Sequence, residues 1–128
     1  FIHGGQLQID GLKMSKSLKN FITIRECVGK FNADQLRMLF LIQSWDGTMN
    51  YQRENTMEEP DTKLATIKSF LRETVPTVMR ERKGKYLPEK WTKEAFDLQN
   101  FLVETKTNIH GFLLKNFDTK STIEALMK

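Results

Sequence analysis

The chain has 128 residues, of which 39% are hydrophobic and 28% are charged, so it can form one ordinary globular domain or two small units and is not typical of a disordered protein. Twenty Lys and Arg residues against sixteen Asp and Glu residues give a formal net charge of +4, which is compatible with a nucleic-acid partner but is weak evidence by itself. The single cysteine, Cys27, excludes an internal disulfide, and with only two histidines it leaves no zinc-ligand framework.

The first predicted element is a short strand. Leu7 and Ile9 alternate with glutamines, as in a half-buried strand, and the β-branched residues at 21–24 indicate a second strand. Asp10 and Gly11 mark the turn that we expect between them.

A short helix should follow, because Thr23 and Glu26 have the spacing of a capping box. We expect this helix to run to about Val28 and to end at Gly29.

The next helix, over residues 33–45, should begin after Asn32, a good capping residue. Its apolar residues are so dense that we expect most of its circumference to be covered: Leu36, Leu39, Phe40 and Ile42. Trp45, Asp46 and Gly47 should stop the helix, and residues 48–51 should form a short returning strand.

Residues 53–128 predict an antiparallel α-helical bundle. In the first long helix, apolar residues recur at spacings of three and four: Leu64, Ile67, Leu71, Val75 and Val78. Pro60 can be its first helical residue, whereas Pro76 should kink or divide it.

Gly84 should cap that helix and Pro88 should lie in the following loop. A second long helix should start near Thr92, with one apolar side: Leu98, Leu102, Thr105, Ile109 and Leu113. Asp118 should cap a last short helix. The fold class is therefore mainly α, with a small mixed α/β unit followed by the helical bundle.

Three lysines recur at intervals of three after the first turn, at Lys13, Lys16 and Lys19, and are interleaved with Ser15 and Ser17. Ammonium groups on flexible stems suit phosphate oxygens, and hydroxyls can add hydrogen bonds. The pattern indicates an anion site. A solvated surface loop remains the alternative at this level.

Residues 13–17 read Lys-Met-Ser-Lys-Ser, the signature loop of class I aminoacyl-tRNA synthetases. The longer string KMSKSLKNFITI resembles the cysteinyl-tRNA synthetase family in its eukaryotic form. The Asp-Gln-Leu-Arg stretch at 34–37 stands where many members read Asp-Ala-Leu-Arg. The resemblance covers most of the chain and is strongest over residues 1–51.

This resemblance implies a cytoplasmic ligase that uses ATP with Mg²⁺ to convert cysteine to cysteinyl adenylate and then charges tRNA(Cys). It implies that Lys16 contacts the ATP phosphates and that Lys13, Ser15 and Ser17 assist. It also implies three parts: the end of the nucleotide-binding domain with the signature loop (1–20), a stem-contact unit (21–52) and a tRNA-binding helical region (53–128).

The family's His-Ile-Gly-His motif and its zinc ligands lie upstream of the signature loop, and nothing in this chain replaces them. The chain opens on Phe1 without an initiator methionine, so we expect a fragment that is inactive alone. No apolar run approaches the length of a membrane span, and no signal peptide is evident.

Two further functions stay open: a related ligase that joins cysteine to a small amine, and a non-catalytic tRNA-binding or interaction module. Arg25, Lys30 and Arg37 could face tRNA phosphates. Core packing is the expectation for the aromatic residues and the cysteine, which are Phe40, Trp45, Tyr51 and Cys27.

Overall fold

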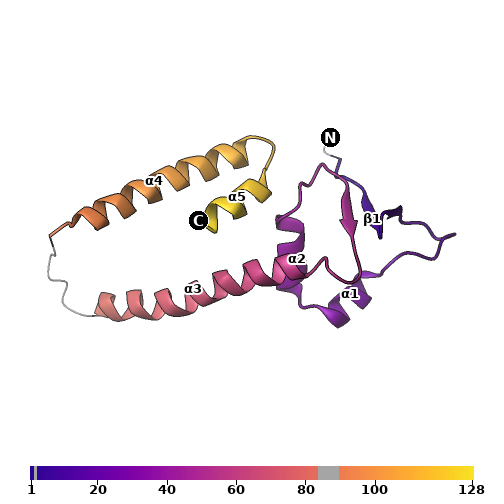
Figure 1. The fold of residues 1–128 in the computed structure, drawn as a ribbon, viewed down its shortest axis with the longest axis horizontal. Helices are drawn as coiled ribbons and strands as arrows, with labels where there is room; N and C mark the ends of the chain where they lie inside the picture. The colour runs from indigo at the N-terminus through magenta and orange to yellow at the C-terminus, as the bar shows by residue number, and fades with distance from the viewer. Residues whose placement is uncertain (2, 84–89) are drawn as a thin grey trace.

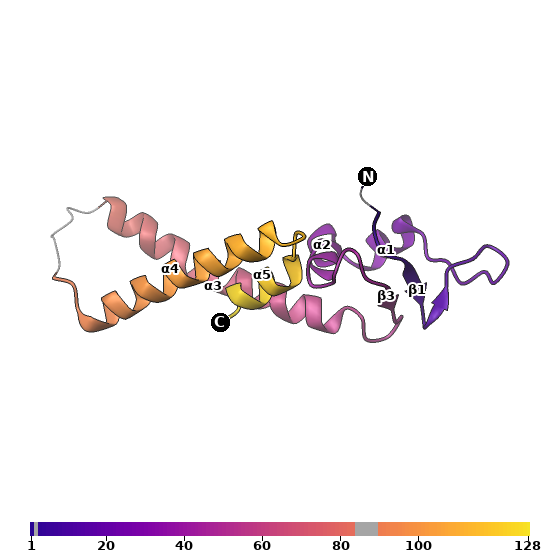
Figure 2. The ribbon, with the colours of Figure 1, turned by 90° about the horizontal axis from the view of Figure 1, so that it is seen from above.

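The computed structural model describes the whole chain except residue 2 and residues 84–89. The expected cap at Gly84 and the loop at Pro88 lie outside the described residues. A small α/β unit occupies one end of an elongated molecule, and two long helices extend from it toward the other end (Figures 1 and 2).

A three-stranded sheet organises the α/β unit, in the order β2-β1-β3. Strand β1 (Leu7–Ile9) pairs antiparallel with β2 (Leu12–Lys13) and parallel with β3 (Met49–Tyr51). The second strand therefore forms immediately after the turn, and the expected strand over 21–24 is wrong. Residues 21–23 are irregular because the cap at Thr23 starts a helix directly afterwards.

Helix α1 (Ile24–Lys30) has the predicted capping box. The Glu26 N–H donates to Thr23 Oγ1 over 3.2 Å, and the Thr23 N–H donates to Glu26 Oε2 over 2.8 Å. The expected stop at Gly29 is wrong, because Gly29 does not take the left-handed conformation of a helix-ending glycine and the helix continues to Lys30.

Helix α2 (Ala33–Leu41) begins at Asn32, as predicted, and Gln35 completes a second capping box. It is shorter than expected and is covered on one side only: Leu39 is 2% exposed, but the neighbouring Phe40 is 61% exposed. Because the residues packed against α2 cover Met38 and Leu39 but leave Phe40 exposed, the expectation that most of its circumference is buried is wrong.

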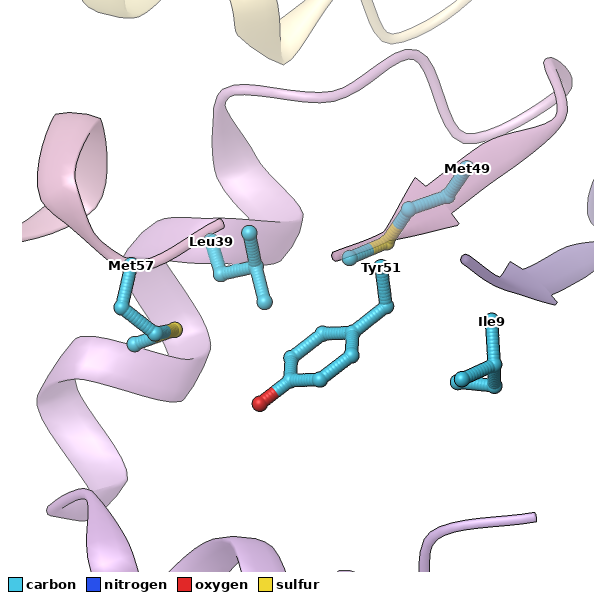
Figure 3. Packing of buried hydrophobic residues seen from close by; sticks show 5 residues of the cluster. All are labelled: Ile9, Leu39, Met49, Tyr51 and Met57. Carbon is cyan, nitrogen blue, oxygen red and sulfur yellow. The ribbon is translucent and has the colours of Figure 1, made fainter. Parts of the chain in front are cut away.

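The core of the α/β unit is formed by residues distant in sequence: Ile9, Leu39, Met49, Tyr51 and Met57. Figure 3 shows the Tyr51 ring between the Ile9 side chain and those of Leu39 and Met57. These five residues come from four segments, because Met49 and Tyr51 both belong to β3, and they hold the sheet against α2.

Helix α3 (Glu58–Lys83) is a single helix that runs through Pro76. The expected division at Pro76 is wrong, because the helix continues on both sides of it: proline removes one backbone donor but has a φ that a helix accepts. Pro60 is the third residue of α3, not the first.

Helix α4 (Lys93–Leu114) starts after Thr92, where its start was predicted, with Thr92 as its cap, and α5 (Thr119–Leu126) starts after its predicted cap at Asp118. The chain is mainly α, as predicted. Helix α5 folds back along α4, but α3 and α4 stand apart over their described residues (Figure 1). No described helix is both long and apolar enough to cross a membrane.

Candidate functional site

The segment from Lys13 to Asn20, called the lysine loop below, connects β2 to α1. It is not placed between two paired strands as expected, because β2 ends at Lys13. The loop lies at the opposite end of the molecule from the far ends of α3 and α4 (Figure 2). Lys16 and Ser17 are exposed, and Ser15 is half-buried.

The lysine loop has its own hydrogen bonds. The Leu18 N–H donates to Ser15 Oγ over 3.1 Å, and the Ser15 and Ser17 hydroxyls lie 3.1 Å apart. The Lys19 N–H donates to the Lys16 carbonyl over 3.3 Å. These bonds form a tight turn and bring together the two predicted serines, so the loop is an ordered turn.

The turn before the loop is anchored to the returning strand. Asp10 and Gly11 both have positive φ, 50° and 79°, a region that glycine enters at little cost. The Gly11 N–H donates to Asn50 Oδ1 over 2.8 Å, and Arg53 Nε lies 3.4 Å from Asp10 Oδ2. Met14 packs against the buried core. The start of the loop is therefore fixed.

The three loop ammonium groups have no ion-pair partner among the carboxylates of the described residues. An exposed lysine without a carboxylate partner is free to bind an external anion. The lysine loop thus presents uncompensated positive charge together with hydroxyl groups, which is the chemistry of a phosphate site.

A hollow of about 290 Å³ separates the lysine loop from α1. Lys19, Lys30 and Arg53 line it. Glu26 lines it too, and the Thr23 N–H, then the Thr23 hydroxyl, hold the pKa of Glu26 below its ordinary value. One carboxylate therefore faces three cations. Of these cations the sequence pointed to Lys19 and Lys30, but Arg53 was missed because it reaches the hollow only through the fold.

The aromatic residues differ from one another in burial. Tyr51 is 7% exposed, and burial chiefly raises its pKa, so its predicted core position is confirmed. Trp45 is half-buried and donates its indole N–H to the Asn116 carbonyl over 2.6 Å. For Phe40, which is largely exposed, the core prediction is wrong. Cys27 is only half-buried.

Arg25 and Arg37 are exposed, and their proposed contacts with phosphate stay predictions. Within the described part of the chain, no three His, Cys, Asp or Glu side chains are grouped to hold a metal ion. These residues do not fit a zinc site, and no step of the chemistry below passes through zinc.

Comparison with known proteins agrees with this chemistry. Residues 1–61 match the family model described as the class I (C) catalytic domain of tRNA synthetases. The chain is 37% identical over 126 residues to the cytoplasmic cysteine–tRNA ligase of Dictyostelium discoideum. It is 40% identical over 132 residues to the human cytoplasmic cysteine–tRNA ligase.

Each of these two alignments covers 98% of this chain. The chain spans 19% of the length of the Dictyostelium protein and 17% of the human one. The resemblance to cysteinyl-tRNA synthetases predicted from the signature loop is confirmed, and it extends through the helices.

Proposed function

We infer that the chain is a segment of a class I aminoacyl-tRNA synthetase, and we propose that the complete protein is a cytoplasmic cysteine–tRNA ligase. In this proposal the complete enzyme activates cysteine with ATP to form cysteinyl adenylate and then transfers the cysteinyl group to tRNA(Cys). The observation that carries the proposal is the ordered lysine loop, whose ammonium groups have no carboxylate partner in the described part of the chain.

Lys16 would act on the departing group of the first step. When the cysteine carboxylate attacks the α-phosphorus of ATP, the bond to the β-phosphate oxygen breaks and negative charge grows on pyrophosphate. A cation directed at that charge stabilises the transition state more than bound ATP. Lys16 then acts as an electrostatic catalyst: its ammonium group stays charged and transfers no proton.

The neighbouring groups of the lysine loop would bind the remaining phosphate oxygens. Lys13 would add a second charge, and Ser15 and Ser17 would donate hydrogen bonds. Mg²⁺ would enter with ATP and neutralise part of the triphosphate charge.

The rest of the chain would serve the tRNA. Residues 1–20 would form the end of the nucleotide-binding domain. Residues 21–52 would contact the tRNA stem, and residues 53–128 would contribute to tRNA binding. Zinc and the partner motif of the signature loop would belong to another part of the complete enzyme. We therefore expect no cysteine-dependent pyrophosphate exchange from residues 1–128 alone, and exchange by that purified chain would contradict this assignment.

The sharpest test is Lys16→Ala in the complete protein. We expect the rate of cysteine-dependent ATP–pyrophosphate exchange to fall about a hundredfold or more, on the order of 3 kcal/mol, by analogy with loss of one oxyanion-stabilising donor. Lys106→Ala, an exposed lysine on α4, is the matched control and should leave the rate unchanged. An unchanged rate in Lys16→Ala would refute the role of the lysine loop.

A tRNA-binding module without catalysis is the second candidate. The hollow lined by Lys19, Lys30 and Arg53 favours it, because these three cations suit tRNA phosphates. Charge reversal at Lys30 and Arg53 should weaken tRNA binding and reduce its salt dependence, since fewer counterions are released. Binding measured at two salt concentrations tests this. If the charge-reversed complete protein loses tRNA affinity but keeps pyrophosphate exchange, the result supports both catalysis by the complete protein and tRNA binding at the hollow. If the unmodified complete protein binds tRNA but shows no exchange, the result supports the non-catalytic module alone.

A further inference from the structure

Asn20 ends the lysine loop and is bonded back to its beginning. Its Oδ1 accepts a hydrogen bond from the Ser15 N–H over 2.9 Å, and its Nδ2 donates to the Lys13 carbonyl over 3.2 Å. One half-buried side chain thus uses both an acceptor and a donor on the backbone of the same short segment. An ionised carboxylate could only accept, and a hydroxyl would have to donate and accept at a single oxygen, whereas the amide carries its acceptor and its donor on two separate atoms of one rigid plane.

The two bonds close residues 13–20 into a ring. Neither a strand nor a helix holds residues 14–20, since β2 ends at Lys13 and α1 begins only at Ile24, so apart from the packing of Met14 against the core the loop depends on its own hydrogen bonds. Lys19 also has a φ of 49°, a conformation that residues other than glycine seldom adopt without support from their surroundings. The Asn20 side chain supplies that support at the adjacent position.

Lys16 lies on the ring between the two ends that Asn20 joins. Its side chain has no carboxylate partner in the described part of the chain. The position of the ammonium group therefore depends on the position of the ring backbone that carries the side chain. Fixed charges are effective in catalysis because they require no reorganisation as the transition state forms. A backbone that wanders by about 1 Å can cost about a hundredfold in rate.

We propose that Asn20 is a positioning residue for adenylation: its side-chain amide holds the lysine loop closed and so directs Lys16 at the ATP phosphates. This inference rests on the proposed function. Asn20 itself touches neither ATP nor cysteine in this account, and it acts through the backbone at Lys13 and Ser15.

The test is Asn20→Ala in the complete protein. The kcat of ATP–pyrophosphate exchange should fall about tenfold or more, whereas the KM for cysteine should not change. Single-turnover transfer of cysteine from preformed cysteinyl adenylate to tRNA should keep its rate, because pyrophosphate has already left. Asn108→Ala, an exposed asparagine on α4, is the matched control and should keep the parent's kcat for ATP–pyrophosphate exchange, a reaction without tRNA.

Two further measurements separate positioning from general damage. In Asn20→Ala, the Ser15 amide should exchange hydrogen with solvent faster, while amides of the buried core keep their protection. Asn20→Asp retains the acceptor and loses the donor, so its loss of kcat should lie between those of the parent and Asn20→Ala, with the added charge appearing mainly in the KM for ATP.

The outcomes distinguish this inference from the proposed function. If Lys16→Ala abolishes exchange and Asn20→Ala matches the parent in kcat and loop protection, the positioning role is overturned and the proposed function stands. If Lys16→Ala has no effect, the proposed function fails first. A fall in the transfer rate equal to the fall in exchange would mean that Asn20 serves only the general stability of the fold, which also overturns the inference.

Discussion

The α/β unit (residues 3–57) and the helical arm (residues 58–128) both contain helices with apolar residues on one side, but the two regions differ in how much of that apolar surface is buried. In the α/β unit, Ile9 and Leu39 are each 2% exposed. In the helical arm, Phe70 is 63% and Leu98 is 69% exposed, and the buried residues of the described arm are Ile123, at 8%, and Pro60 at its base. An amphipathic stripe therefore predicts a helix without predicting what packs against it.

The helical arm joins the α/β unit through the first turns of α3 and through α5, both of which pack against α2. Ile123 packs with Met38 and Ile42 of α2 and its end. The Asn116 side chain donates to Asp46 Oδ2 over 2.8 Å, near the bond from the Trp45 indole. On the other side, Gln35 Nε2 donates to Asp61 Oδ1 over 2.7 Å. The arm is thus fixed at its base, while the apolar faces of α3 and α4 farther out stay uncovered.

The largest effect on stability should come from truncating a buried leucine of the α/β unit, and truncating an exposed leucine of the helical arm is the comparison. Leu39→Ala should lower the free energy of unfolding by about 3 kcal/mol, since it removes buried contacts and leaves a cavity. Leu98→Ala should change it by less than about 0.5 kcal/mol, because its side chain is already solvated. Denaturant unfolding of residues 1–128 measures both. Equal losses would mean that the arm is packed in solution, and the contrast between the regions would fail.

Removing the capping side chain of a helix should lower stability by a smaller amount, and the region of the protein that loses stability should differ between α2 and α4. Asn32→Ala removes the acceptor of the Gln35 N–H at α2, and Thr92→Ala removes the acceptor of the Ala95 N–H at α4. Each should cost about 1 kcal/mol.

In α2 the loss should lower global stability, whereas in α4 it should appear as fraying of the first turn, measured by amide exchange. Asn32→Asp and Thr92→Ser keep a capping oxygen and are the controls. A global loss from Thr92→Ala as large as that from Asn32→Ala would contradict the distinction.

The smallest effect concerns pH at the joint. The Ser121 N–H, then its hydroxyl, hold the pKa of Asp118 below its ordinary value of 3.8, so the charged cap stabilises α5 at neutral pH. That contribution is present above the ordinary pKa and is lost as the pH falls through the lowered one.

Asp118→Asn keeps a capping oxygen and should remove this part of the pH dependence, as followed by protection of the Ser121 amide between about pH 5 and pH 2. The same acid lability in Asp118→Asn as in the parent would show that another group is responsible. Asp46 is the first to examine, because hydrogen bonds from Ser44, then Asn116, lower its pKa.

Local features were predictable because their hydrogen bonds join residues three apart in the chain. Thr23, Asn32 and Asp118 each cap the helix expected of them, and the helix expected near Thr92 starts there. The anion site at the lysine loop stays a prediction, which the sequence allows because the loop residues are contiguous and carry their charges and hydroxyls themselves.

Features that depend on distant residues were not predictable in this way. The pairing of β1 with β2 over residues 12–13, the exposure of Phe40 and the approach of Arg53 to Lys19 and Lys30 all follow from which segments meet in space. The periodicity of apolar residues shows which side of a helix or strand is apolar, but it does not show whether another element packs against that side.

The sequence by itself determined the helices and most of their starts, because these rest on short-range geometry, and it placed three lysines and two serines in one short loop. Only the tertiary structure decided that the loop follows a hairpin anchored by Asn50, that Asn20 closes it, and that α3 and α4 stand apart. Those outcomes are set by contacts between segments, whose free energy is the difference between burial and the entropy of bringing distant parts of the chain together.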